Sequence, residues 1–219
     1  MVAFVALTIA LGNWQRHRAA EKDALRAQLD ASMSQVPLDL AVLPENAAAS
    51  RFRPVRVQGT FDAAHQLLLD NKVHAGRVGY DVVTPLRIAS SGAYVLVDRG
   101  WIAQGASRAQ LPKVDPPPGP TIVDGRINLP ARYFELTTGT AAGPVVENLD
   151  IGRIAAKSGL VLAPFVIEQT GEGDGLLRDW PAPDFGAEQN RSYMLQWYAF
   201  AGIALVLWLT VNWRRQAKL

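Results

Sequence analysis

The chain of 219 residues contains no cysteine. This absence excludes disulfides, iron–sulfur clusters, CxxC redox chemistry and thiolate metal sites. Histidine is scarce as well: His17, His65 and His74 form no H-E-x-x-H motif or other metal-ligand spacing, so we predict no metal site. Copper delivery is disfavoured, because three methionines and no cysteine leave too few soft ligands.

A large excess of one charge is also missing. The net charge is +2, and no cluster of Lys and Arg stands between aromatic residues, so nucleic acid is not an expected partner. There is no P-loop, dinucleotide fingerprint or G-x-S-x-G motif, and we predict that the chain is not an enzyme. Asp179 and Asp184 flank Trp180-Pro181, which keeps a hydrolase outside the cytoplasm open as an alternative.

Formal charge is absent from Ser192 to Asn212. About twenty helical residues span roughly 30 Å, the thickness of the hydrocarbon core of a bilayer. Aromatic residues that suit the membrane interface lie near both ends of this stretch: Tyr193, Trp197, Tyr198, Trp208 and Trp213. We predict a transmembrane helix at 191–213, and the basic tail at 214–219 places its end in the cytoplasm.

The N-terminal stretch is apolar for only about twelve residues, roughly 18 Å of helix. It lacks the basic start and the A-x-A cleavage site of a signal peptide. We predict a first transmembrane helix at 1–14; the other interpretation is a truncated span that begins upstream. Two spans leave both termini in the cytoplasm and place residues 15–190 outside it, in the periplasm of a Gram-negative cell.

The whole chain is 49% hydrophobic, and its middle carries turn signals between short strands, which is typical of a folded domain. A helix is expected from Trp14 to about Ser34, and a short one from Asp150, its N-cap, to Ser158, with Gly159 ending it. Strands are expected at 54–62, 66–71, 80–88, 93–98, 121–128 and 161–169, with weaker candidates at 133–136 and 144–147. The predicted fold class is α+β: two terminal transmembrane helices flank an extracytoplasmic domain built on an antiparallel sheet or partly closed β-barrel with short helices.

A few positions within these elements have specific expectations. Gly59 indicates a bulge or a close approach of another backbone, and Pro85 an edge strand or a bulge. Residues 72–79 are expected to form a hairpin connection. Asp98 and Arg99 should point to opposite faces of their strand and serve a structural role at its end. The GEGDG sequence at 171–175 is expected to be a flexible loop without the ligand spacing of a calcium site.

Several motifs resemble those of the Surfeit locus protein 1 family, in the family's order. They are Leu11-Gly12-Asn13-Trp14-Gln15-Arg16 with Lys22 and Leu25, Arg53 to Phe61 around Gly59, Gly79-Tyr80-Asp81-Val82-Val83-Thr84-Pro85-Leu86, Val95 to Trp101 including Asp98-Arg99-Gly100-Trp101, Asp179-Trp180-Pro181, and Tyr193-Met194-Leu195-Gln196-Trp197-Tyr198. Each motif is weak alone, but six in register cover nearly the whole chain.

The resemblance implies a bacterial-type assembly factor of haem–copper cytochrome c oxidase in the cell inner membrane, with two spans and a periplasmic domain. It implies assistance in delivering haem a to subunit I or in stabilising subunit I, with subunit I, other oxidase assembly factors and the lipid bilayer as partners. An accessory subunit of a membrane complex, without cofactor binding, is the alternative.

The resemblance also marks a possible haem position. Bacterial members carry a proposed haem-ligating histidine three residues before the tyrosine that corresponds to Tyr193, and here that residue is Asn190. Asparagine is a poor ligand for haem iron. Tyr193, Trp197 and Arg191 are the remaining residues of this segment expected to lie near a haem. Tyr193 is a donor type in principle, and Arg191 could pair with a propionate or extend toward the membrane interface.

Overall fold

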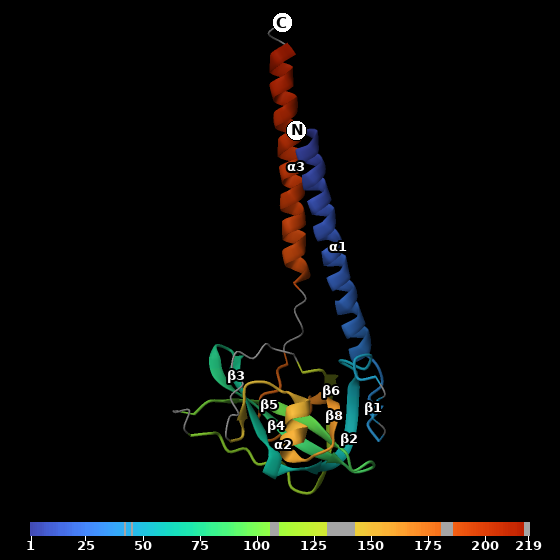
Figure 1. Ribbon diagram of the computed structural model, residues 1–219, viewed down its shortest axis with the longest axis vertical. Coiled ribbons are helices and arrows are strands. Elements are labelled where there is room, and N and C mark those ends of the chain that lie inside the picture. Colours follow the sequence, from blue (N-terminus) through green and yellow to red (C-terminus); the bar gives the residue numbers. More distant parts are fainter. Residues whose placement is uncertain (42, 45, 106–109, 131–142, 181–185, 217–219) are drawn as a thin grey trace. The chain divides into compact units, whose positions relative to one another are not determined.

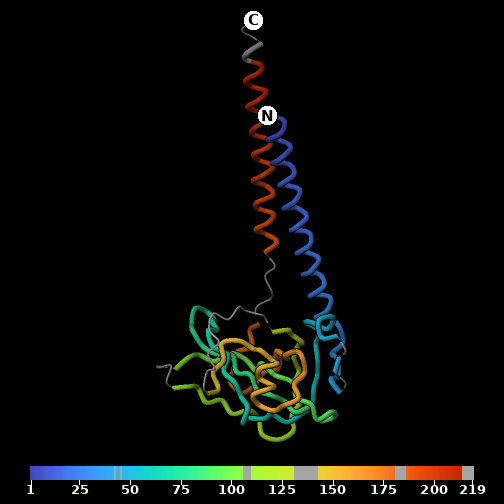
Figure 2. The backbone as a smooth tube through the Cα atoms, in the orientation of Figure 1, coloured from blue at the N-terminus to red at the C-terminus, as the bar shows by residue number. Residues whose placement is uncertain are grey.

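The computed structural model describes residues 1–41, 43–44, 46–105, 110–130, 143–180 and 186–216. The chain divides into two compact units, one formed by Met1–Asp30 with Ala182–Leu219 and the other by Ala31–Pro181. The first unit contains the helices α1 (Val2–Met33) and α3 (Ala187–Gln216), and the second contains eight strands and the short helix α2 (Ile151–Ser158). Figures 1 and 2 show α1 and α3 side by side and antiparallel.

In the described part of the chain, one helical segment, Ala187–Trp213, is long and apolar enough to cross a membrane, and only 11% of its most apolar window is buried. It overlaps the predicted span at 191–213. The predicted first span and the predicted helix from Trp14 form one continuous helix, α1. The apolar part of α1 does not meet the length and hydropathy of a full span, so α3 is the one candidate membrane span in the described part of the chain.

The strands of the second unit form a closed barrel of five strands. In chain order the strands are β1 (Leu38–Asp39), β2 (Pro54–Phe61), β3 (Leu67–His74), β4 (Arg77–Ile88), β5 (Tyr94–Ala103), β6 (Pro120–Asn128), β7 (Val145–Val146) and β8 (Leu162–Gln169). The order β2-β6-β8-β5-β4 returns to β2 through the pairing of Gly59–Phe61 with Leu86–Ile88. All barrel pairs are antiparallel except β5 and β8. The predicted sheet therefore closes completely.

The barrel interior is filled by alternating side chains from all five strands. They include Val55, Val57, Leu86, Ile88, Val95, Val97, Val123, Ile127, Phe165 and Ile167, each at most 2% exposed. Burial of such side chains stabilises the fold by roughly 1.5–3 kcal/mol each. A second group of apolar residues on the outside of the barrel, including Leu96 and Val166, packs against Ile151 and Ile154 of α2. Asp150 caps α2 and Gly159 ends it at φ +73°, as predicted.

Two glycine and proline positions explain how the barrel closes. A Cβ at Gly59 would lie 2.3 Å from the carbonyl oxygen of Arg87, so the predicted close approach is confirmed where β2 meets β4. Pro85 lies inside the central strand β4, and the prediction of an edge or a bulge there was wrong. It stands where β4 stops pairing with β3 and begins to pair with β2, and its carbonyl accepts a hydrogen bond from Asp62. Proline has no backbone N–H to donate, and at this point between two strand pairings no continuous ladder of hydrogen bonds requires one.

Other expected boundaries shift because strand pairing extends them. The predicted connection at 72–79 is mostly paired strand, and only Ala75 and Gly76 form the turn between β3 and β4. Strand β5 continues through Arg99-Gly100-Trp101 to Ala103 instead of ending at Asp98. The weak strand at 144–147 is confirmed as β7, whereas the candidate at 133–136 lies outside the described residues.

Candidate functional site

The residues singled out from the sequence gather in two places, one in each unit. The helix pair contains Asn190, Arg191, Tyr193 and Trp197 together with the Trp14-Gln15-Arg16 motif. The barrel unit contains the Asp98-Arg99-Gly100-Trp101 motif and the strand β4 motif. Pro181 of the Asp179-Trp180-Pro181 motif lies outside the described residues.

Helix α1 presents a stripe of small and polar residues toward α3. Thr8, Gly12, Gln15 and Ala19 are buried at helical spacing, while their neighbours Trp14 and Arg16 are exposed. Small residues let two helices approach closely in a bilayer. A Cβ at Gly12 would lie 2.4 Å from the ring of Tyr198, so the tyrosine packs directly against the glycine backbone.

Polar contacts between the two helices lie beside this stripe. The hydroxyl of Tyr198 donates to Asn13 Oδ1 at 2.8 Å. The amide of Asn190 donates to Gln15 Oε1 at 2.5 Å, and its oxygen accepts from Lys22 Nζ at 2.5 Å. Both polar atoms of Asn190 are therefore engaged in holding α3 to α1.

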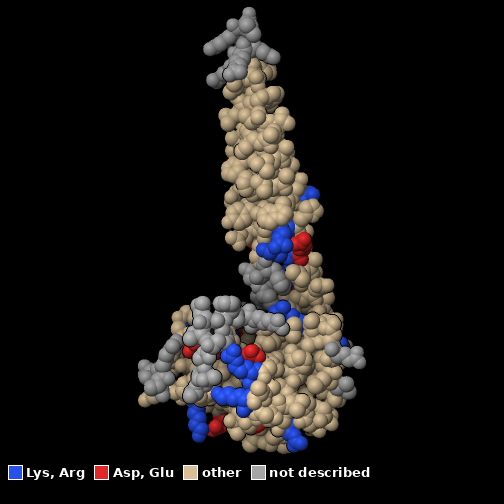
Figure 3. All heavy atoms as spheres, in the orientation of Figure 1, with Lys and Arg blue, Asp and Glu red and all other residues tan. Residues whose placement is uncertain are grey.

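The neighbouring predicted residues have different surroundings. Arg191 pairs with Asp23 of α1 at 2.6 Å and also with Glu188 one turn earlier. Tyr193 is 44% exposed, and Trp197 makes an edge-to-face contact with Phe200 at 5.9 Å between ring centroids. On the face that Figure 3 shows, the upper part of the described helix pair has no charged atoms, and atoms of Lys, Arg, Asp and Glu lie on its lower part. This distribution suits a membrane helix whose polar end lies at the interface.

The haem expected from the family resemblance does not fit these residues. Asn190 is no axial donor, and its amide is occupied by Gln15 and Lys22. The guanidinium of Arg191 is occupied by Asp23 and Glu188. Tyr193 is the one predicted residue of an axial donor type left in this segment, and its exposure leaves it without an enclosing pocket.

In the barrel unit, Arg99 is fully buried at the end of the barrel interior. Its guanidinium donates to Asp174 Oδ2 at 2.7 Å, to Gln66 Oε1 at 3.0 Å and to the backbone oxygen of Asp115 at 3.2 Å. The Gln66 oxygen also accepts from Thr84 Oγ1 at 3.0 Å. One side chain of β5 thus binds the start of β3, the link around Asp115 and the loop at Asp174.

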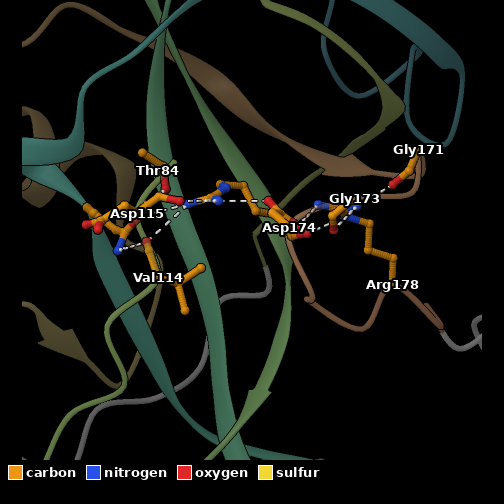
Figure 4. A network of polar contacts seen from close by, with 9 residues as sticks. Thr84, Val114, Asp115, Gly171, Gly173, Asp174 and Arg178 are labelled. Atoms are coloured by element: carbon orange, nitrogen blue, oxygen red, sulfur yellow. Dashed lines mark hydrogen bonds and ion pairs between the residues drawn. The ribbon is translucent and has the colours of Figure 1, made fainter. Parts of the chain in front are cut away.

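Asp174 is shared by two arginines. Arg178 donates to its second carboxylate oxygen and to the backbone oxygens of Gly171, Gly173 and Arg99. Figure 4 shows Asp174 between Arg178 and the remainder of the network, with the carbonyl groups of Gly171 and Gly173 directed at Arg178. The 171–175 segment, expected to be a flexible loop, is therefore fixed at several points. Asp174 itself has φ +52°, a left-handed conformation that Asp tolerates better than most residues.

Gly100 and Trp101, the other residues of the β5 motif, hold the segment around Leu177 against the barrel. Gly100 has φ +135°, and a Cβ there would lie 2.7 Å from the carbonyl oxygen of Leu177. Trp101 exchanges backbone hydrogen bonds with Leu177, and its indole N–H donates to the Lys72 carbonyl at 3.2 Å. The Trp101 ring also covers Gly79, where a Cβ would be 2.6 Å from the ring. Gly79 and Gly100 are glycines because other chain segments occupy the place of a side chain.

The other motif residues are also structural. Tyr80 is 2% exposed and packs with Leu68, Val82 and Leu176. Trp180 donates its indole N–H to the Gln169 carbonyl at 2.7 Å. Among the described residues, no group of three or more His, Asp or Glu side chains is placed to hold a metal ion.

Asp98 points away from Arg99, to the outside of the barrel, as predicted from their adjacent positions in one strand. It is 6% exposed and its Oδ1 atom has no hydrogen-bond partner among the described residues. Burial, and next the nearby carboxylate of Asp81, raise the pKa of Asp98 well above its ordinary value. Asp81 is also buried, and this burial raises its pKa although Lys72 pairs with it at 2.8 Å.

Sequence reasoning missed the partners that complete these contacts. Asp174, Arg178 and Gln66 stand far from Arg99 along the chain, and Asp23 and Lys22 stand far from α3. The only sequence signal was Asp174, one of the two acidic residues of GEGDG, which lies four positions before Arg178. That signal does not identify Arg99 as the second partner.

Comparison with known proteins gives a match to the SURF1 family over residues 2–202. The chain is 26% identical to a SURF1-like protein of Monosiga brevicollis, over 95% of this chain and 85% of that protein. It is 31% identical to Surfeit locus protein 1 of Mus musculus over 44% of this chain and 36% of that protein. It is also 27% identical to the cytochrome oxidase assembly protein SHY1 of Saccharomyces cerevisiae, over 48% of this chain and 27% of that protein.

The arginine network yields a first prediction. Asp174→Asn removes the only carboxylate that the described residues offer to both buried guanidinium groups, while asparagine still tolerates the positive φ. Breaking a buried ion pair costs about 3–5 kcal/mol, so we expect the free energy of unfolding to fall by about 3 kcal/mol. Urea titration followed by tryptophan fluorescence measures it. Asp115→Asn is the matched control, because the Asp115 side chain is 78% exposed. A loss no larger than that of the control contradicts this role for Asp174.

Asp98 yields a second prediction, concerning pH. The folded state keeps a proton on Asp98 that the unfolded state releases above about pH 4, so folding stability of the wild type falls as pH rises from there to the raised pKa. Asp98→Asn removes this dependence. We expect the variant to be more stable than the wild type at pH 7, with a difference that grows by about 1.4 kcal/mol per pH unit within that window. Unfolding at pH 4, 5, 6 and 7 measures it, and a variant less stable than the wild type at pH 7 disproves the assignment.

Proposed function

The chain belongs to the SURF1 family, and from that premise we propose that it is a membrane-anchored assembly factor for haem–copper cytochrome c oxidase. The observation that carries the proposal is the extent of the family match, which runs through both the helix pair and the barrel. The similar yeast protein is named a cytochrome oxidase assembly protein, which supports a role in oxidase assembly. The proposed role is not enzymatic, in keeping with the yeast relative that is named for assembly.

We propose subunit I as the client and the bilayer as the place of contact. Helix α3 has the length and composition of a membrane span. Because α1 lies antiparallel along α3 and is tied to it by Asn13, Gln15 and Lys22, a membrane position of α3 brings the apolar start of α1 into the same layer. Both termini are then cytoplasmic and the barrel unit is periplasmic, in the cell inner membrane.

Haem a enters this proposal as cargo of subunit I maturation. Asn190 and Arg191 are engaged between the helices, and Tyr193, the one predicted residue of an axial donor type, is exposed and has no enclosing pocket. These contacts favour stabilisation of subunit I over carriage of haem on this chain. Other oxidase assembly factors would then handle the cofactor itself.

Gene deletion in the native host tests the assembly role. We expect membranes of the deletion strain to lose most of their haem a absorbance, oxidase activity and subunit I, and the wild-type gene to restore all three. The mature oxidase, purified from the restored strain, should not retain the protein in equimolar amount. Equimolar retention would favour the alternative, an accessory subunit. Unchanged oxidase content in a strain without a second family member would refute both.

Whether this chain itself binds haem is tested by substitutions at position 190. Wild type, Asn190→His and Asn190→Ala are purified from a host that makes haem a, and pyridine haemochrome spectra are recorded. Both variants lose the contacts with Gln15 and Lys22, but only the histidine supplies an axial donor. We expect no stoichiometric haem in the wild type or the alanine variant and increased retention in the histidine variant. Stoichiometric haem in the wild type would overturn the proposal that haem is only cargo.

A further inference from the structure

A belt of charged side chains crosses the outside of the barrel, away from the arginine network. Its members come from five neighbouring strands, in the order Lys72 of β3, Asp81 of β4, Asp98 of β5, Glu168 of β8 and Arg126 of β6. The strand register places Asp98 opposite Glu168, and Glu168 opposite Arg126. Val97, Ile127 and Ile167, which precede or follow these residues, face the barrel interior, so the charges face outward.

Charge within the belt is balanced at both ends but not in the middle. Lys72 pairs with Asp81 at 2.8 Å. Arg126 pairs with Glu168 at 2.6 Å, and Asn128 donates to the other Glu168 oxygen at 2.6 Å. Asp98, between these two pairs, forms no ion pair among the described residues, although Lys72 lies near enough to act on its charge. The backbone N–H of Gly100 donates to its carboxyl group, but its Oδ1 accepts no hydrogen bond. A buried polar atom without a partner costs about 1–3 kcal/mol.

A cavity of about 620 Å³ opens at this point of the belt, a size typical of ligand pockets. Asp98 and Glu168 line it, and four acidic and two basic residues stand among the described lining residues, so acidic charge is in excess. The Asp98 atom without a partner thus belongs to a residue of a concave, acidic site.

The chemistry of the site selects an organic cation. A divalent metal would need several free oxygen ligands, whereas the carboxylates of Asp81 and Glu168 are already paired with Lys72 and Arg126. One unpaired buried carboxyl suits one ammonium or guanidinium group. Guanidinium is the more weakly hydrated of the two and pairs with carboxylates through a planar fork, which favours it in a partly buried site.

We propose that this cavity binds an arginine side chain of a partner polypeptide, with Asp98 as the residue that receives its guanidinium group. The identification of the partner as an oxidase client or assembly factor rests on the function proposed above. The binding itself rests only on the cavity and the belt. Asp98 thereby has a role that offsets the cost of burying an acid in the barrel wall.

Binding is tested on the full-length protein in detergent with the tripeptide acetyl-Gly-Arg-Gly-amide, using isothermal titration calorimetry or NMR. The citrulline tripeptide, of the same shape but neutral, is the matched ligand. We expect the arginine peptide to bind at least tenfold more tightly than the citrulline peptide, and Asp98→Asn to remove the preference. Asp115→Asn makes the same chemical change at an exposed site outside the cavity and should keep it.

The pH dependence gives a second readout. Because Asp98 must lose its proton to pair with the cation, the affinity should rise with pH, by up to tenfold per unit below the raised pKa. Equal binding of both peptides, or binding unchanged in Asp98→Asn, overturns the proposal. Tighter binding of free agmatine than of the arginine peptide also overturns it, in favour of a small diffusible amine.

The partner is tested by restoring the deletion strain with either variant. We expect Asp98→Asn to restore less than half of the oxidase content at a normal protein level, and Asp115→Asn to restore it fully. Full restoration by Asp98→Asn, despite lost peptide binding, refutes an oxidase-related partner. If deletion itself leaves the oxidase unchanged, the proposed function fails, whereas the peptide measurements still decide whether the cavity binds arginine.

Discussion

The buried guanidinium of Arg99 sets a requirement that much of the barrel unit serves. A charge at 0% exposure is stable only with a carboxylate and further acceptors around it. These come from Asp174, Gln66 and the backbone near Asp115, three segments that are distant in sequence. Satisfying one side chain therefore fixes the start of β3, the link around Asp115 and the loop after β8. Arg178 repeats the arrangement on the other side of Asp174.

The two charged residues at the end of β5 illustrate opposite uses of a buried charge. Arg99 faces inward and has partners from several segments, whereas Asp98 faces outward, lines a cavity and forms no ion pair among the described residues. A buried polar network whose groups all have hydrogen-bond partners makes the fold more rigid, whereas a network with an unpaired group lowers its stability. Places where a fold keeps such a cost are commonly functional. This contrast directs attention to the outer face of the barrel rather than to the more conspicuous arginine cluster.

The helix pair revises the meaning of position 190. From the family resemblance alone, asparagine there is a missing haem ligand. In the structure it is a contact between helices, since its amide joins Gln15 and Lys22 of α1 to α3. Hydrogen bonds between membrane helices are moderate, about 0.6–2 kcal/mol each, but several in one zone favour a defined register. Asn190 therefore has a role of its own that does not involve iron.

Sequence by itself was sufficient for the family, the apolar C-terminal helix, most of the strands, the caps of α2 and the opposite directions of Asp98 and Arg99. All of these depend on neighbours within a few residues or on a hydrophobic run. Closure of the barrel, the position of Pro85 inside a central strand and the ordering of the 171–175 loop were decided only by the tertiary structure. Their cause is contact between distant segments: Gly59 against Arg87, Asp174 against Arg99, and Asn190 against Lys22. Local patterns say which residues are able to pair, and only the fold brings their partners within hydrogen-bonding distance.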